Sequence, residues 1–341
     1  MQMGLFDEEN RLEKLSQLGD SLVRLNSVIQ WEIFRPVLEE ALRKEPKGAG
    51  GRPPYDSLLM FKVLVLQRIY NLSDDDQAEF QINDRRSFMR FLGLNAEDRV
   101  PDAKTIWLFR DNLVKADVMR KLFDIFSRQL EAAHLITRTG TIVDATFVDA
   151  PRQRNTREEN ASIKAGEIPG EWEKEENASK LRQKDTDARW TKKGNETHYG
   201  YKDHVKADAE SKLITGYIVT SANVHDSRAL LELVDGKDKF LYADSAYSGA
   251  ELQAKLPETV EARIHEKGYR NRPLTEAQKE SNRKKSKIRV RIEHIFGFMT
   301  MSLHELTVRS IGIARATFNA GLTNLVYNLC RYEFLCRPQS A

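Results

Sequence analysis

The sequence predicts an all-helical N-terminal region followed by an α/β domain built on a mixed sheet. Up to about residue 135, apolar residues recur at three- and four-residue steps, which is typical of amphipathic helices. From residue 139 onward, stretches rich in β-branched residues alternate with helical patterns. A chain of 341 residues suits one large or two ordinary domains. We therefore predict an N-terminal domain at 1–135 and a second domain at 136–341.

Turn signals separate the helices of the N-terminal region. Residues 48–54, Gly-Ala-Gly-Gly-Arg-Pro-Pro, predict a loop because they interrupt the apolar pattern. Ser73 precedes three aspartates and predicts a helix cap and first turn, where acidic groups complement the helix dipole. The helices we expect lie at 8–46, 55–70, near 84–92, at 102–115 and at 117–134. Trp107 and Phe109 are expected to belong to the core of this domain.

The second domain is predicted to begin with a strand at 139–148. Two strands at 198–206 and 213–220 flank a polar turn and predict a hairpin. The remaining elements we expect are a helix at 226–234, a strand at 239–243, a helix at 249–256, a strand at 260–264, and helices at 275–304 and 311–335. This order matches that of a ribonuclease H-like fold. Residues 151–196 are dense in charge and predict an extended or partly disordered insertion, although Trp172 and Trp190 lie within it.

Composition indicates a polar chain that can still bury a core. It is 40% hydrophobic and 31% charged, with a mean hydropathy of −0.57 and a net charge of +3. No apolar run approaches the roughly 20 residues of a membrane span, and residues 1–9 lack a signal-peptide pattern. Cys330 and Cys336 fit no CxxC motif, so we interpret them as buried or semi-buried thiols of a reducing compartment. We expect a protein of the bacterial cytosol, associated with the nucleoid.

A basic run precedes a single acidic residue, Glu293, in a segment with a helical pattern. Its six members are Arg283, Lys284, Lys285, Lys287, Arg289 and Arg291. Basic side chains attract a polyanion, and a carboxylate among them repels that polyanion unless it holds a metal. The alternative is an exposed surface pair between Glu293 and Arg289, which is four residues earlier on the helix.

Two further carboxylates lie beside β-type runs. Asp144 interrupts an apolar strand, where a charge is costly without a partner or a metal. Asp244 follows a strand at the position where open α/β sheets usually carry their sites. The alternatives are a buried Asp144 satisfied by backbone donors and an Asp244 that caps a turn. Asp149 is a weaker candidate than Asp144 because it lies on the other face or past the strand end.

Three acids from two strands and a helix, with basic residues around the third, predict a two-metal phosphoryl-transfer site that works on nucleic acid. A zinc site at His198 and His204 is disfavoured because a separation of six residues keeps them far apart on a strand and no cysteine accompanies them. His225 is expected to cap a helix. His294 points away from the Glu293 face by about 100° of helix rotation, so we do not assign it to the metals.

Five motifs occur in a fixed order along the chain. They are Asp-Ala-Thr at 144–146, His-Tyr-Gly-Tyr-Lys-Asp-His at 198–204, Ala-Asn-Val-His-Asp-Ser at 222–227, Ala-Asp-Ser-Ala-Tyr at 243–247, and Arg-xxx-Glu at 289–293. Over nearly its whole length the chain resembles a DDE transposase of the insertion sequence five family. The resemblance implies that Asp144, Asp244 and Glu293 are the catalytic, metal-binding triad. The implied cofactor is a pair of Mg²⁺ ions, for which Mn²⁺ can substitute.

The resemblance also implies the reaction and the partners. Such an enzyme cuts DNA at the terminal inverted repeats of its element and joins the 3′ ends to target DNA. Double-stranded DNA is the expected partner, and a homodimer or larger assembly is expected in the synaptic complex. The residues we expect to contact DNA are Lys284, Lys285, Lys287, Arg289, Arg291, Lys202 and Arg110.

Two positions depart from the family's signature helix, which usually reads Tyr-xx-Arg-xxx-Glu-xxxxxx-Lys. Ser286 stands in place of the tyrosine and Thr300 in place of the lysine that helps to hold a DNA phosphate. Thr300 supplies no charge, so one alternative is a catalytically impaired copy that acts as a DNA-binding regulator of the element. A further alternative is a structure-selective nuclease of the same fold, which the helical N-terminal domain and the chain length disfavour.

Overall fold

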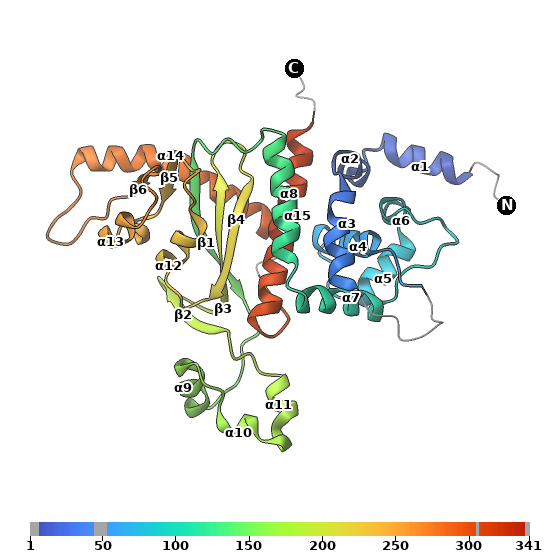
Figure 1. The fold of residues 1–341 in the computed structure, drawn as a ribbon, viewed down its shortest axis with the longest axis horizontal. Coiled ribbons are helices and arrows are strands. Elements are labelled where there is room, and N and C mark those ends of the chain that lie inside the picture. Colours follow the sequence, from blue (N-terminus) through green and yellow to red (C-terminus); the bar gives the residue numbers. More distant parts are fainter. Residues whose placement is uncertain (1–6, 44–52, 305–306, 338–341) are drawn as a thin grey trace. The chain divides into compact units, whose positions relative to one another are not determined.

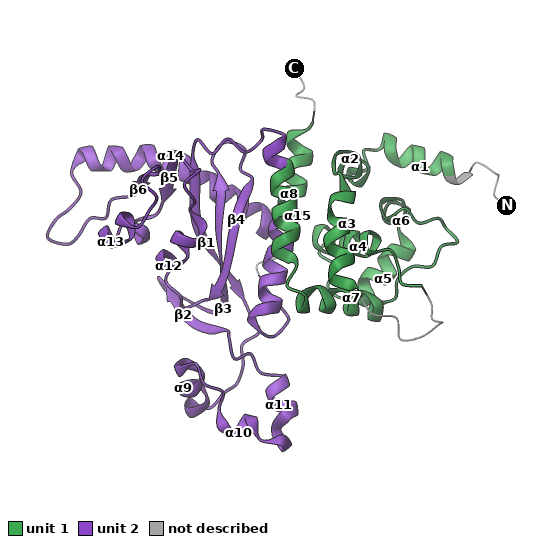
Figure 2. Ribbon diagram, viewed as in Figure 1, with its two compact units in different colours: residues 1–129, 325–341 green, residues 130–324 purple. Residues whose placement is uncertain are grey.

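The computed structural model divides into two compact units (Figure 2). It describes residues 7–43, 53–304 and 307–337. The first unit consists of residues 1–129 and 325–341, and the second of residues 130–324. The first unit ends at residue 129, where the sequence predicts a domain boundary at 135, and residues 325–341 group with this unit. Residues 48–52 of the predicted loop lie outside the described residues.

The first unit is helical throughout its described residues, as predicted (Figure 1). Its elements are α1 (Asp7–Gln17), α2 (Ser21–Val28), η1 (Trp31–Phe34), α3 (Arg35–Leu42), α4 (Ser57–Ile69), α5 (Asp75–Asp84), α6 (Arg86–Leu92), α7 (Ala103–Lys115), most of α8 (Met119–Ala132) and the C-terminal part of α15 (Ile313–Leu335). Its core contains packed aromatic rings: the Phe34 centroid lies 5.1 Å from that of Phe61 and 6.2 Å from that of Phe126. Burial of such large apolar side chains is the main source of stability for short helices.

Two predictions in this unit need correction. The cap of α5 is Asp74 rather than Ser73: an Asp74 carboxylate oxygen accepts a hydrogen bond from the backbone N–H of Gln77 at 2.7 Å, and the Ser73 hydroxyl donates to Asp74. Trp107 is 51% exposed, whereas Phe109 is buried. Residues two positions apart on a helix are separated by about 200° of rotation, so these two cannot both face the same core.

The second unit is built on a six-stranded mixed sheet, which confirms the predicted α/β class. Its strands are β1 (Thr141–Asp149), β2 (Arg189–Lys193), β3 (Glu196–Asp208), β4 (Ile214–Ser221), β5 (Phe240–Ala243) and β6 (Glu261–Ile264). The order is β2-β3-β1-β5-β6, with β4 also paired to β3. Strand β1 pairs antiparallel with β3 and parallel with β5, and β5 pairs parallel with β6. Strand β1 is therefore central.

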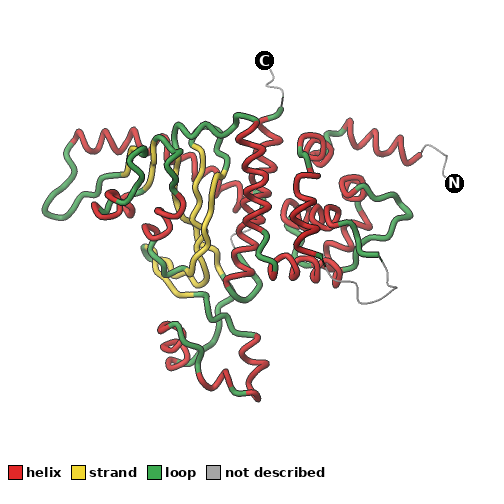
Figure 3. The backbone as a smooth tube through the Cα atoms, viewed as in Figure 1, coloured by secondary structure: helices red, strands yellow, loops and turns green. Residues whose placement is uncertain are grey.

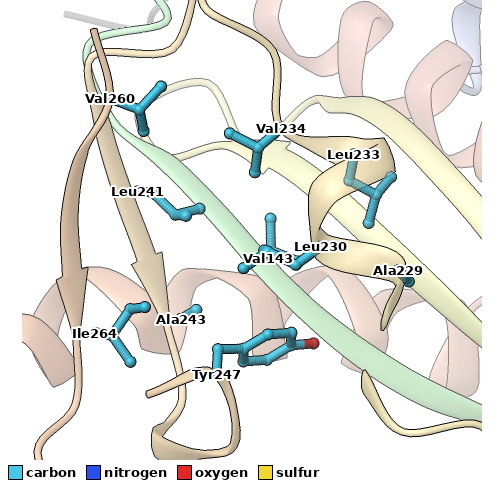
Figure 4. Packing of buried hydrophobic residues seen from close by; sticks show 10 residues of the cluster. All are labelled: Val143, Ala229, Leu230, Leu233, Val234, Leu241, Ala243, Tyr247, Val260 and Ile264. Carbon is cyan, nitrogen blue, oxygen red and sulfur yellow. The ribbon is translucent and has the colours of Figure 1, made fainter. Parts of the chain in front are cut away.

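Helices cover both faces of this sheet. Successive residues of a strand point to opposite faces. Val143 therefore packs in a cluster with Leu230 of α12 (Asp226–Leu233) and with Tyr247 of η3 (Ser245–Tyr247), as Figure 4 shows. Asp144 points to the other face, toward α14 (Glu276–Met301). Val148 packs on that same face with α15 (Ile313–Leu335). A further helix, α13 (Ala250–Ala254), lies between β5 and β6 in the sequence.

The expectation of an extended or partly disordered insertion at 151–196 is wrong. The segment forms α9 (Arg157–Ala165), α10 (Gly170–Glu173), η2 (Glu175–Asn177), α11 (Ala178–Arg182) and the edge strand β2 (Figure 3). Trp172 is fully buried, and its indole N–H donates to a Glu159 carboxylate oxygen at 2.7 Å. Glu159 also completes the capping box of α9 with Thr156. One buried tryptophan and one capping box order a segment that is otherwise too polar to fold.

Among the described residues, no helix combines the length and the apolar character that a membrane crossing requires.

Candidate active site

Parallel strand pairing brings Asp144 and Asp244 together. In the register of β1 and β5, Thr141 pairs with Leu241 and Ile142 with Tyr242. Two residues further along, Asp144 and Asp244 stand at the same level of neighbouring strands. Because β5 ends at Ala243, Asp244 begins the turn that follows, and its carboxylate accepts a hydrogen bond from the backbone N–H of Ser245 at 2.6 Å. Asp244 thus follows the end of a strand and also caps the turn after it, so both interpretations of this residue from the sequence apply.

Asp144 is the more buried of the two carboxylates, with a side chain that is 19% exposed. Burial raises its pKa above the ordinary value, and the nearby Asp244 adds to the effect. The backbone N–H of Ala145, 2.8 Å away, and the charges of Arg289 and Lys193 act in the opposite direction. A carboxylate in such surroundings is stabilised by a nearby cation.

Helix α14 presents one face to the strand ends. Ser286, Arg289 and Glu293 are spaced three and four residues apart and so share this face. One Arg289 nitrogen lies 2.8 Å from an Asp144 oxygen, and another lies 3.7 Å from a Glu293 oxygen. Glu293 is 58% exposed. The structure therefore places Asp144 and Glu293 on either side of a guanidinium group, and the described residues contain no group of three or more His, Cys, Asp or Glu side chains arranged to hold a metal ion.

His265 is a member of this site that the sequence analysis missed. Ala243 pairs with Ile264 in the parallel register of β5 and β6, so the next residues, Asp244 and His265, are also level. Nδ1 of His265 lies 3.9 Å from an Asp244 oxygen, and Nε2 lies 3.2 Å from the backbone carbonyl oxygen of Asn282. Burial lowers the pKa of the imidazole. The sequence contains a signal for this residue, because His265 directly follows a predicted strand, as Asp244 does.

The cations predicted to contact DNA differ in their surroundings. Lys284 and Lys287 on α14 are exposed. The other members make contacts within the protein: Lys202 with Asp226, Lys285 with the carbonyl of Ile264, Arg289 with Asp144, Arg291 with the carbonyl of Ala209, and Arg110 with Asp75 in the first unit. Lys284 and Lys287 can therefore bind a phosphate directly. Each of the other cations must give up its contact within the protein to do so.

The two departures from the signature helix have definite contacts. The Thr300 hydroxyl donates to the carbonyl oxygen of Phe296, one turn earlier, at 2.8 Å. The Ser286 hydroxyl lies 3.0 Å from Nε2 of His265. Thr300 is thus bonded to its own helix, while Ser286 links that helix to the end of β6.

The other candidates lie apart from these carboxylates. Asp149 ends β1 and lies 3.4 Å from His198, whose ring stacks on Phe147. His294 accepts a hydrogen bond from Lys212. His225 caps α12, as predicted.

Cys330 is partly buried, as expected, but Cys336 is exposed because it lies just beyond the end of α15.

Carboxylates at the same level of neighbouring parallel strands, facing a helix that carries a third acid, define a class of α/β proteins with a polar site between sheet and helix. The chain belongs to the family described as Transposase DDE domain, whose model matches residues 136–329, and is an enzyme of the DDE transposase type. A second family, described as Transposase domain (DUF772), matches residues 10–112.

One solved structure similar to this chain is described as "Cryo-EM structure of piggyBac transposase synaptic complex with hairpin DNA (SNHP)". It is 12% identical, with a TM-score of 0.44 over 89% of this chain and 74% of that one. Similarity at this level carries no argument about function.

DDE transposases act on DNA and generally use divalent metal ions. The donors in this chain fit such an ion in their chemistry, because Asp144, Asp244 and Glu293 are hard oxygen ligands. Arg289 places a positive charge beside the partly buried carboxylate of Asp144, so this position accommodates a cation.

Proposed function

We propose that the protein cuts DNA at the terminal inverted repeats of a mobile element and joins the freed 3′ ends to target DNA. In this proposal Asp144, Asp244 and Glu293 are the catalytic carboxylates, and the second unit has a ribonuclease H-like fold. The motif order supports placement in the insertion sequence five family. The observation that carries the proposal is the shared level of Asp144 and Asp244 on neighbouring parallel strands, beneath the α14 face that holds Glu293.

The three carboxylates would hold Mg²⁺, with Mn²⁺ able to replace it. When bound, such ions activate the attacking oxygen and stabilise the leaving oxygen of an in-line displacement. The chain's own residues bind and orient the phosphodiester. Arg289 lies within 4 Å of both Asp144 and Glu293 and is the cation placed to pair with a phosphate in the site. Burial raises the pKa of Asp144, and the positive charge of Arg289 opposes this and so favours the ionised carboxylate.

DNA binding in this proposal begins on the exposed cations of α14. Lys284 and Lys287 contact phosphates first, and Lys285, Arg289 and Arg291 follow by exchanging internal contacts. Lys202 and Arg110 are further proposed contacts. Phosphate contacts fix position rather than sequence, so affinity should fall steeply as salt concentration rises. Because two element ends must be held together, we propose a homodimer or larger assembly, acting in the bacterial cytosol.

The test is strand cleavage and joining by purified protein with Mg²⁺ or Mn²⁺ and DNA that carries the gene's own flanking ends. We expect metal-dependent cleavage and joining by the unmodified protein and none by Asp244→Asn or Glu293→Gln. Glu280→Gln is the matched control, because Glu280 lies on the same helix and pairs there with Arg283. Cleavage without joining would favour a nuclease, and activity retained by both site variants would refute the assignment.

Thr300 favours a second candidate function, a DNA-binding regulator with impaired catalysis. The residue supplies no positive charge, and its hydroxyl is bonded to its own helix. This candidate predicts specific binding to the element ends without cleavage. Thr300→Lys would then restore cleavage, whereas an active unmodified protein would exclude the regulator.

A further inference from the structure

His265 lies level with the carboxylates of the proposed site across three neighbouring parallel strands. Asp144 lies within β1, while Asp244 and His265 directly follow β5 and β6 at the same level. The His265 side chain is only 10% exposed, so its ring is held by its surroundings. Its two nitrogens face different groups: Nδ1 faces Asp244, and Nε2 faces α14.

Contacts with α14 determine which nitrogen carries the proton. Nε2 lies 3.0 Å from the Ser286 hydroxyl, which can donate or accept, and 3.2 Å from the Asn282 carbonyl oxygen, which only accepts. Both contacts are satisfied together when Nε2 is the donor. In the neutral ring, Nδ1 then carries a lone pair. The same stretch of helix is tied to the end of β6 by further hydrogen bonds: the Asn282 amide bonds both backbone groups of Glu266, and Lys285 donates to the carbonyl of Ile264. Ring orientation and tautomer are thereby fixed.

The gap between His265 and Asp244 has the size of an ion-bridged contact. At 3.9 Å, Nδ1 and the Asp244 oxygen are too far apart for a hydrogen bond. Two donors that each lie about 2.1 Å from one ion are separated by roughly 3 to 4.2 Å. Histidines that bind metals usually donate their other ring N–H to a carbonyl or carboxylate, which is the arrangement of Nε2 in this chain.

We propose that Nδ1 of His265 is a metal ligand beside Asp244, so that the site binds its ion through nitrogen as well as oxygen. The inference rests on the proposed function, because it adds a donor to that same carboxylate site. An imidazole donor favours transition-metal ions over Mg²⁺. The protein should therefore bind Mn²⁺ more tightly than Mg²⁺ by a margin that depends on His265.

The test is Mn²⁺ binding by the full chain without DNA, followed by electron paramagnetic resonance. Electron spin-echo modulation from a directly bound ¹⁴N nucleus is expected in the unmodified protein. His265→Gln should abolish this modulation and weaken Mn²⁺ binding about tenfold. Its amide can still donate to Asn282 in place of Nε2, so the melting temperature should change little. Ser286→Ala is the matched control: it removes the other neighbour of Nε2 and should leave the modulation in place.

Three outcomes would overturn the inference. They are Mn²⁺ bound without nitrogen modulation, modulation that persists in His265→Gln, and no Mn²⁺ binding by the unmodified protein. Should His265→Gln fail to fold, His265→Asn serves as the second variant, and nitrogen modulation that persists in it also counts against ligation. Asp244→Asn separates the two proposals: if it abolishes both Mn²⁺ binding and DNA cleavage while His265→Gln alters neither, the catalytic assignment stands and His265 is not a ligand.

Discussion

A buried aspartate on β3 leads to the prediction that can be worked out furthest. Asp203 lies beneath α15 in the second unit, and one carboxylate oxygen accepts a hydrogen bond from the Asn324 amide at 2.8 Å. Its other oxygen and the Asn324 carbonyl oxygen have no hydrogen-bond partner among the described residues. Burial raises the pKa of Asp203 from 3.8 to about 7. A buried carboxylate with one oxygen that lacks a donor favours the protonated acid.

This raised pKa ties stability to pH. Between pH 3.8 and about 7 the folded protein keeps the Asp203 proton that the unfolded chain has lost, so the free energy of unfolding falls as pH rises through this window. The contribution is fully present below 3.8 and is lost by about 7. Roughly 3 pH units at about 1.4 kcal/mol each give a penalty of about 4 kcal/mol at higher pH, as an upper bound.

Asp203→Asn should remove this penalty. The new amide cannot ionise, and its N–H can donate to the Asn324 oxygen that now lacks a partner. Measured by urea unfolding, the variant should be more stable than the unmodified protein near pH 8, by about 2 to 4 kcal/mol, and the difference should shrink toward pH 4. Asp208→Asn is the matched control on the same strand. Asp208 accepts several backbone hydrogen bonds, so its variant should lose stability at every pH. A difference independent of pH, or an Asp203→Asn protein that is less stable near pH 8, would refute the reasoning.

Further predictions concern the backbone, the insertion and the thiols. Gly200→Ala should destabilise the second unit by about 2 kcal/mol or more in urea unfolding, because φ is +147° and the new Cβ would lie 2.3 Å from the Val148 oxygen. Retained stability would show that β3 can shift. Trp172→Ala should expose residues 151–196 to limited proteolysis, through a loss of about 3–5 kcal/mol of packing, while the sheet stays intact. Unchanged cleavage would contradict a core built on this tryptophan. A thiol reagent should modify Cys336 in the native protein and both cysteines in denaturant, because Cys330 is partly buried and this burial raises its pKa to about 12. Modification of both thiols in the native state would contradict this burial.

The order of the elements could be predicted because the signals are local. Apolar periodicity marks α4 and α7, and β-branched runs mark β1 and β4, where the structure and the predictions agree closely. The insertion could not be predicted in the same way. Its order depends on contacts between separate parts of the segment, such as those of Trp172 and Lys180 with Glu159, which composition does not reveal. Strand β2 was missed although Gly194 and Asn195 are a typical hairpin turn.

Some residues of the candidate site could be predicted from the sequence and others could not. Asp144 and Asp244 could be proposed from their strands, but their shared level follows from a parallel register that only the sheet fixes. The contact of Arg289 with Asp144 was not foreseen because it joins residues from distant parts of the chain. His265 was overlooked because the residue that follows β6 was not considered alongside the residue that follows β5. The catalytic roles of these residues stay predictions until the cleavage assay is done.

The shared helix α15 has a consequence for how the chain folds as it is made. The first unit needs residues from both ends, since Glu333 accepts a hydrogen bond from Arg24 at 3.0 Å and the Tyr332 ring packs 5.9 Å from that of Phe126. A ribosome must therefore complete residues 130–324 after the N-terminal helices have emerged. At roughly 5–20 residues per second this takes on the order of 10–40 s. During that interval the surface that later packs against the C-terminal helix is exposed to solvent. We therefore expect a chaperone to bind the nascent N-terminal region.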